Sequence, residues 1–200
     1  MKNTLLLKGV ITTKTAIIDP NLPRSCKKHW IATGALVHEA LKHSYLSMVE
    51  RELEGDSMPI DEAYLILAGK IPTLRQKRTQ VGRNYLLAKH NNALSLFGSL
   101  SQDIEGRLKV GFISKADETG KSKQNIRIVD YTEADISLLI SVLNEWANNT
   151  HLGENTEIGF GEFEAYWQVF LNDSEIGFIS LKQGVMEHNF SFEASEATCC

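Results

Sequence analysis

Basic side chains gather in a loop that follows the first apolar stretch of the sequence. The loop contains Pro20 and Pro23, and its second half carries the basic side chains of Arg24, Lys27, Lys28 and His29. Four such side chains within six residues offer several donors to phosphate oxygens. We therefore interpret this loop as a candidate contact for a polyanion such as RNA.

A second cationic stretch lies at about 70–92. No Asp or Glu occurs anywhere in 63–102, and the cationic side chains that we single out are Arg75, Lys77, Arg78, Arg83 and Lys89. Flexible cations of this kind can follow a single-stranded nucleic acid, and Tyr85 beside them can stack on a base. The plainer interpretation is a solvated charged loop. We expect an insertion rather than a core element, and a second candidate RNA contact.

A glycine-bearing loop, 153–161, ends in Gly159, Phe160 and Gly161. Glycine lets a backbone approach a ligand closely, and N–H groups of such a loop can face phosphate. We include these three residues among the RNA-binding candidates. The alternative is a turn in which the glycines only supply positive φ angles.

Candidates for catalysis are weaker. Asp19 precedes Pro20, a pair that commonly begins a turn, and one carboxylate without metal-binding partners is a thin basis for hydrolysis. His29 has the chemistry of a general base but equally that of a phosphate contact. The three cysteines, Cys26, Cys199 and Cys200, form no CxxC pair, so we expect reduced thiols and neither a metal nor another cofactor.

The charge of the chain is divided between its two parts. Residues 1–128 carry 20 Lys and Arg against 12 Asp and Glu, whereas 129–200 carry 1 against 13, so net charges of +8 and −12 give the total of −4. This division predicts a basic surface for phosphate and an acidic surface facing away from it or toward a neighbouring copy. A solvated acidic face is the alternative.

The composition is that of a globular protein, with 42% apolar and 23% charged residues in a chain of 200. Lys8 interrupts the first apolar run, which is too short for a signal peptide, and no stretch approaches a membrane span. We expect a single cytoplasmic domain over 1–200, without a membrane partner, and with a flexible tail at about 185–200.

Periodicity predicts the elements that position these residues. We expect strands at 5–11, 107–113, 126–129, 162–171 and 175–181, helices at 33–54, 60–67 and 132–148, and a mobile polar loop at 115–125. Asn172 and Asp173 are typical of a tight turn between two strands. The order predicts an α+β fold, a ferredoxin-like or RRM-like antiparallel sheet with helices on one face.

Three segments together resemble a known family. They are 96–99 (LFGS) with 106–110 (GRLKV), 151–153 (HLG) with 158–163 (IGFGEF), and 30–40 (WIATGALVHEA). In this order they resemble the "LFG … GRLxV", "LGG … GFG" and "GSSLKGALR" segments of the RAMP superfamily of CRISPR-associated proteins, most closely the family-seven backbone subunits of the type IV kind. The resemblance spans about 5–182. His38, Glu39 and Lys42 stand where the family has arginines, and Ile158 stands where it has a basic residue.

The resemblance implies a subunit that assembles side by side along a guide RNA (crRNA) and presents it for pairing with a target. Its implied partners are guide RNA, target nucleic acid, neighbouring copies of itself and other CRISPR effector subunits. Related type III subunits cut target RNA with an Asp in the loop that corresponds to Asp19. We expect no enzyme activity here.

Two alternatives stay open. The first is a RAMP-type endoribonuclease, for guide processing or target cleavage, which needs His29 or His38 beside a basic residue. The second is a non-catalytic α+β protein-interaction module, in which the charge division serves a protein partner.

Overall fold

The computed structural model describes residues 3–23, 28–53, 92–98, 105–114 and 120–190, and the side chains of these except 49–53, 113 and 114. Among the described helices, none has the length and apolar character needed to cross a bilayer. The predicted helix at 60–67 and most of the predicted insertion at about 70–92 lie outside the described residues.

A six-stranded antiparallel sheet organises the fold, with the strand order β4-β5-β1-β6-β7-β8. Its strands are β1 (Thr4–Thr13), β4 (Leu108–Ser114), β5 (Lys121–Val129), β6 (Phe163–Leu171), β7 (Ser174–Lys182) and β8 (Val185–His188). The first four strands of that order, with a helix after β1 and another after β5, reproduce the βαββαβ arrangement of a ferredoxin-like fold. The predicted fold class is confirmed, and the β7–β8 hairpin extends the sheet beyond it.

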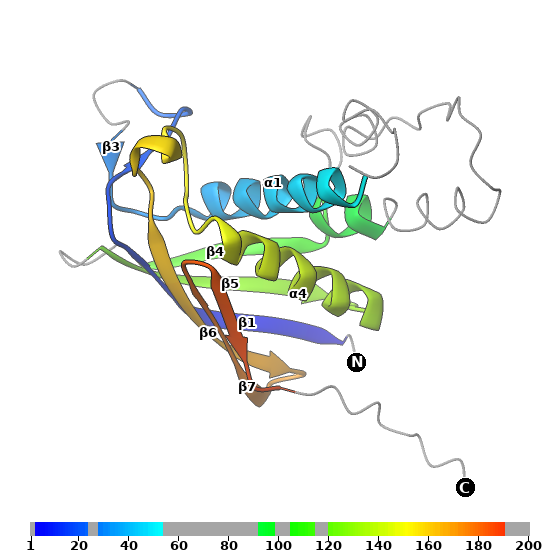
Figure 1. Cartoon of the computed structure of the whole chain (residues 1–200). Helices are drawn as coiled ribbons and strands as arrows, with labels where there is room; N and C mark the ends of the chain where they lie inside the picture. The colour runs from blue at the N-terminus through cyan, green and yellow to red at the C-terminus, as the bar shows by residue number, and fades with distance from the viewer. Residues whose placement is uncertain (1–2, 24–27, 54–91, 99–104, 115–119, 191–200) are drawn as a thin grey trace, which may run out of the picture.

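The two long helices, α1 (Gly34–Leu53) and α4 (Glu133–Asn148), lie on the same side of the sheet (Figure 1). Both begin where the sequence predicts, because a threonine caps each of them. The hydroxyl of Thr33 accepts from the N–H of Leu36 at 3.3 Å, and Thr132 forms a reciprocal capping box with Asp135. A helical turn at 92–97 lies before β4.

The core fills the space between the helices and the sheet. Trp146 of α4 is buried, and its ring contacts that of Phe163 at a centroid distance of 4.7 Å. Trp167, Leu5 and Leu7 contribute from the central strands, and all three are at most 2% exposed. Burial of these large apolar side chains supplies the main driving force for folding.

Two sequence predictions need correction. The polar stretch 121–125, predicted as part of a mobile loop, is the first half of β5, and 185–188, predicted as tail, is strand β8. Ser122 and Gln124 are buried and both bind the backbone of Ala32. The amide of Gln124 donates to the carbonyl of Ala32, and the hydroxyl of Ser122 accepts from the N–H of Ala32. Polar residues on the inward face remove the hydrophobic alternation by which a strand is found.

Two short strands, β2 (Ile17–Ile18) and β3 (Lys28–His29), pair with each other next to the sheet. The hydroxyl of Thr13 lies within hydrogen-bond distance of the carbonyls of Trp30, at 3.0 Å, and Gly120, at 3.1 Å. Its bond to Trp30 ties the chain after β3 to the end of β1. The small hairpin is thereby fixed at one end of the sheet, beside the glycine-bearing loop (Figure 1).

Candidate nucleic-acid interface

The first basic loop and the glycine-bearing loop, about 130 residues apart in the sequence, meet at this end of the fold. Ile18 of β2 forms a parallel bridge with Gly153, and the N–H of Glu154 donates to the carbonyl of Ile18 at 2.9 Å. The N–H of Gly161 donates to the carbonyl of Ala16 at 2.8 Å. These backbone hydrogen bonds hold two candidate RNA-binding segments against each other. We call this region the hairpin–loop site, defined by 17–21, 28–29 and 153–161.

Lys28 and Phe160 come together across this junction. The ammonium of Lys28 lies 5.3 Å from the centroid of the Phe160 ring, which is within the range of a cation–π contact. Lys28 is exposed, and Phe160 is partly exposed. A cation and an aromatic ring therefore stand side by side on the surface, a combination that suits a phosphate and a base of a single strand.

His29 and Asp19 face each other beneath that surface. His29 Nε2 lies 3.7 Å from Asp19 Oδ2, and the two side chains are only 16% and 8% exposed. His29 Nδ1 accepts from the N–H of Ile31 at 3.2 Å, whereas its buried Nε2 has no hydrogen-bond partner among the described residues. Asp19 Oδ1 also accepts from the N–H of Asn21 at 2.9 Å. Asp19 therefore fixes the turn through the hydrogen bond from Asn21, and His29 lies against it from β3.

The N–H groups of Gly159, Phe160 and Gly161 donate within the protein in this conformation and do not face a ligand. Gly159 N–H donates to Thr156, Phe160 N–H to Asn155, and Gly161 N–H to Ala16, all inside the protein. Gly161 is required for packing, because a Cβ there would lie 1.9 Å from the carbonyl oxygen of Leu152. Of these three residues, Phe160 is the one whose side chain can contact RNA.

A groove lined by carboxylates borders the hairpin–loop site, and its negative charge does not suit a phosphate. It encloses about 790 Å³ between α1, the end of α4 and the loop at 153–156. Glu39, Glu145 and Glu154 line it, with His43 and His151 as the titratable bases. Carboxylates on three sides repel a polyanion, so we expect RNA to follow the Lys28 side of the loop.

Several sequence candidates cannot be placed. Arg24, Lys27, Arg75, Lys77, Arg78, Arg83 and Lys89 lie outside the described residues. Their role in RNA binding stays a prediction. Within the described part of the chain, no group of His, Cys, Asp and Glu side chains is arranged to hold a metal ion.

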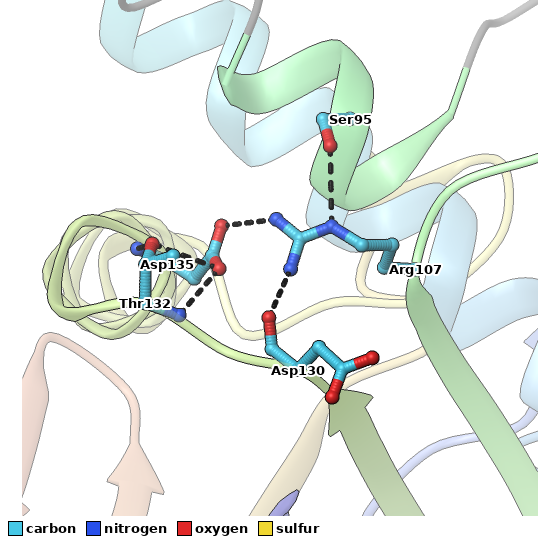
Figure 2. A network of polar contacts seen from close by, with 5 residues as sticks. All are labelled: Ser95, Arg107, Asp130, Thr132 and Asp135. Carbon is cyan, nitrogen blue, oxygen red and sulfur yellow. Dashed lines mark hydrogen bonds and ion pairs between the residues drawn. The ribbon is translucent and has the colours of Figure 1, made fainter. Parts of the chain in front are cut away.

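Arg107 of the GRLKV segment is a residue whose role the sequence did not indicate. Its guanidinium donates to Asp135 Oδ1 at 2.7 Å, to the carbonyl of Asp130 at 3.0 Å and to the hydroxyl of Ser95 at 3.2 Å (Figure 2). Asp135 is fully buried and also accepts from Thr132. Arg107 thus ties the turn at 92–97, the end of β5 and the start of α4 into one unit.

The carboxyl group of Asp135 is held in its charged form. Burial alone disfavours that form, but the hydrogen bonds from Arg107 and Thr132 and the nearby guanidinium charge outweigh it, so the pKa of Asp135 lies below its ordinary value. Thr132 and Asp135 form a local capping pattern within one helical turn, whereas their partner Arg107 is 28 residues away in the sequence, where no local pattern indicates it.

His38, a weak sequence candidate for catalysis, lines a second cavity of about 410 Å³ with Lys42 and the start of α1. Burial, and then the charge of Lys42, hold the pKa of His38 below its ordinary value. Its Nε2 is buried and has no hydrogen-bond partner among the described residues. The neutral imidazole beside a buried ammonium is a pairing that general-base chemistry can use.

Comparisons with known proteins find a similar solved structure but no similar sequence family or curated protein. No family model matches the chain, and no curated protein matches it. Among solved structures, the chain is similar to one from the crystal structure of the Csm3-Csm4 subcomplex in the type III-A CRISPR-Cas interference complex. That match has 14% sequence identity and a TM-score of 0.44, and covers 96% of this chain and 91% of the other.

Proposed function

We propose that this protein is a RAMP-type RNA-binding subunit of a CRISPR effector complex, which assembles copy by copy along a guide RNA. The observation that carries the proposal is the hairpin–loop site, where Lys28 of the basic loop lies over Phe160 of the glycine-bearing loop. The segments that resemble the RAMP family lie at the start of α1, at the start of β4 and in the loop between α4 and β6 of a ferredoxin-like fold. The type IV kind, the finer assignment, rests on the motifs alone.

In this proposal each copy binds backbone and shape, while base pairing reads the target sequence. Lys28 neutralises a phosphate, and Phe160 stacks on a base. The basic side chains of Arg24 and Lys27 precede Lys28 in the chain and are expected to extend the contact. His29 and Asp19 hold the hairpin in place. The proposed partners are guide RNA, a target nucleic acid, other copies of the chain and other effector subunits.

Lys28→Ala is expected to weaken binding to single-stranded RNA about tenfold and to lower the salt slope of log K by about 0.7, the value for one lost phosphate contact. Fluorescence anisotropy with a labelled oligoribonucleotide at several salt concentrations measures both. Ser137→Asp on the exposed side of α4 changes the net charge by the same amount and is the matched control. If Lys28→Ala and Ser137→Asp bind the RNA with equal affinity, Lys28 does not contact RNA and the binding site lies outside the hairpin–loop site.

The assembly is tested separately, by expressing the chain in its native host and sequencing the RNA that copurifies. We expect short, repeat-flanked RNAs in large particles that contain several copies of the chain. A monomer that carries no RNA would contradict the proposal and leave the charge division to a protein partner.

The endoribonuclease remains a second candidate, because His38 stands one helical turn from the buried Lys42 and lines a cavity with it. We expect His38→Ala to abolish any metal-independent cleavage of guide precursor while leaving RNA affinity within about twofold, since general-base catalysis typically contributes a factor of about 100 or more. Cleavage in EDTA, followed on a labelled precursor, is the measurement. If wild type binds this RNA and never cuts it, the ribonuclease is excluded.

A further inference from the structure

The face of the sheet opposite α1 and α4 carries a second cluster of chemistry suited to RNA. Side chains alternate across a strand, so the neighbours of the buried Leu5 and Leu7 point to this open face. Among the described helices, α1 and α4 both lie on the other side of the sheet (Figure 1). Neither α1 nor α4 therefore covers this open face (Figure 1).

Three cations form a triangle on this face. Lys8 of β1 lies directly opposite Asn125 of β5, and Lys123 and Arg127 flank Asn125 at the next outward positions of the same strand. Diagonal neighbours of this kind lie about 7–8 Å apart. All three side chains are exposed, and no described residue forms an ion pair with them. A patch of three uncompensated charges attracts a polyanion.

An aromatic platform stands beside this triangle. Tyr166 of β6 is 49% exposed and is stacked with Phe178 of β7, with centroids 5.6 Å apart and ring planes 23° apart. Tyr166 pairs with Val10, which pairs with Lys123. Lys123 and Tyr166 are thus two strand spacings apart, about 9–10 Å. That span suits a phosphate on Lys123 and the attached base on Tyr166.

The platform borders a hollow of about 350 Å³ whose polar lining is Thr12, Glu164, Ser180, Lys182 and Glu187, and the carboxylate of Glu164 is already paired with Lys14 at 3.0 Å. Carboxylate oxygens only accept hydrogen bonds. The carboxylate of Glu187 can therefore accept from an amino group of cytosine, adenine or guanine, as Glu and Asp accept from the N4 amino group of cytosine, while Lys182 can donate to a ring nitrogen or carbonyl of the same base. Uracil carries a carbonyl oxygen at the ring position where cytosine carries its amino group, so it offers no donor there.

We propose that this open sheet face is a second binding site for single-stranded RNA, with phosphates on Lys8, Lys123 and Arg127 and an amino-bearing base on Tyr166. The inference extends the proposed RNA-binding function to a face that the hairpin–loop site does not reach. Bases splayed on the aromatic surface of a sheet are a physically favourable mode of single-strand recognition.

The probes are labelled oligocytidine and oligouridine of equal length, titrated by anisotropy against the full chain. We expect wild type to prefer oligocytidine. Tyr166→Ala is expected to lower its affinity about tenfold, the usual loss for one stacked base, whereas Tyr166→Phe keeps stacking and most of the affinity. Lys8→Ala with Lys123→Ala is expected to reduce the salt slope by about 1.4, and Ser137→Asp with Ser141→Asp on α4 is the control of equal charge.

The outcomes separate this site from the hairpin–loop site. If Lys28→Ala weakens binding while the Tyr166 and lysine variants leave it unchanged, the open-face site is wrong and the proposed function stands. If only the open-face variants weaken it, the hairpin–loop site is wrong instead. If the open-face variants alter the sedimentation of the RNA-free chain but no RNA affinity, the face binds a second copy, and this inference is overturned.

Discussion

Replacing Asp135 by Ala is expected to lower the free energy of unfolding by about 3 kcal/mol, the lower end of the range for removing one partner of a buried ion pair, because the Arg107 side chain is still 32% exposed. Asp135 is fully buried and accepts from Arg107 at 2.7 Å (Figure 2). Its loss leaves the guanidinium without its counter-ion and removes half of the capping box on α4. Urea unfolding followed by circular dichroism measures the change.

Glu133→Ala is the matched control, because Glu133 is also an acid in the first turn of α4 but is exposed. We expect it to cost at most about 0.5 kcal/mol, the size of a helix-dipole contribution at the surface. If the two variants lose equal stability, the Arg107–Asp135 contact contributes no more than a general charge effect at the helix N-terminus.

The same carboxyl gives the stability a defined pH dependence. The pKa of Asp135 is below its ordinary value in the folded protein, so folding favours the charged form. The resulting stabilisation is complete above the ordinary pKa of about 4 and is lost as the pH falls through the lower folded pKa. The difference in unfolding free energy between wild type and Asp135→Asn should therefore be constant near neutrality and shrink in acid. A difference that grows in acid would contradict the direction of the shift.

Gly161→Ala is the second substitution with a large expected effect, a loss of about 3 kcal/mol or more. Gly161 has φ of 76°, and a Cβ there would lie 1.9 Å from the carbonyl oxygen of Leu152. Positive φ costs an alanine about 1 kcal/mol, and the contact with fixed backbone adds strain that only a shift of the loop relieves. Since the loop carries Phe160, we also expect weaker RNA binding in the folded fraction.

Gly159→Ala separates these two causes, because Gly159 has a similar φ of 89° but open space around the added Cβ. It should cost only about 1 kcal/mol and leave the Lys28–Phe160 contact intact. Thermal unfolding of the pair, with RNA anisotropy on the folded variants, makes the comparison. Equal losses would mean that backbone conformation alone makes Gly161 necessary.

Local signals in the sequence were enough for much of the fold. The predicted helices 33–54 and 132–148 begin within a residue of α1 and α4, and the turn at Asn172–Asp173, with φ of 48° and 69°, joins β6 to β7 as predicted. These features depend on neighbours within a few residues. The first half of β5 was missed because its inward residues Ser122 and Gln124 are polar, and their hydrogen bonds to Ala32 cannot be seen in a periodic pattern.

The candidate sites divide in the same way. The sequence alone determined that the chain has a basic N-terminal part and an acidic C-terminal part, and it indicated Lys28 and Phe160 as candidates for RNA contact. Only the tertiary structure placed Lys28 over Phe160, joined Arg107 to Asp135, and set Lys8, Lys123 and Arg127 beside Tyr166. The physical reason is that strand pairing brings together residues distant in the chain. The order β4-β5-β1-β6-β7-β8 turns a charge division along the sequence into a division across one sheet.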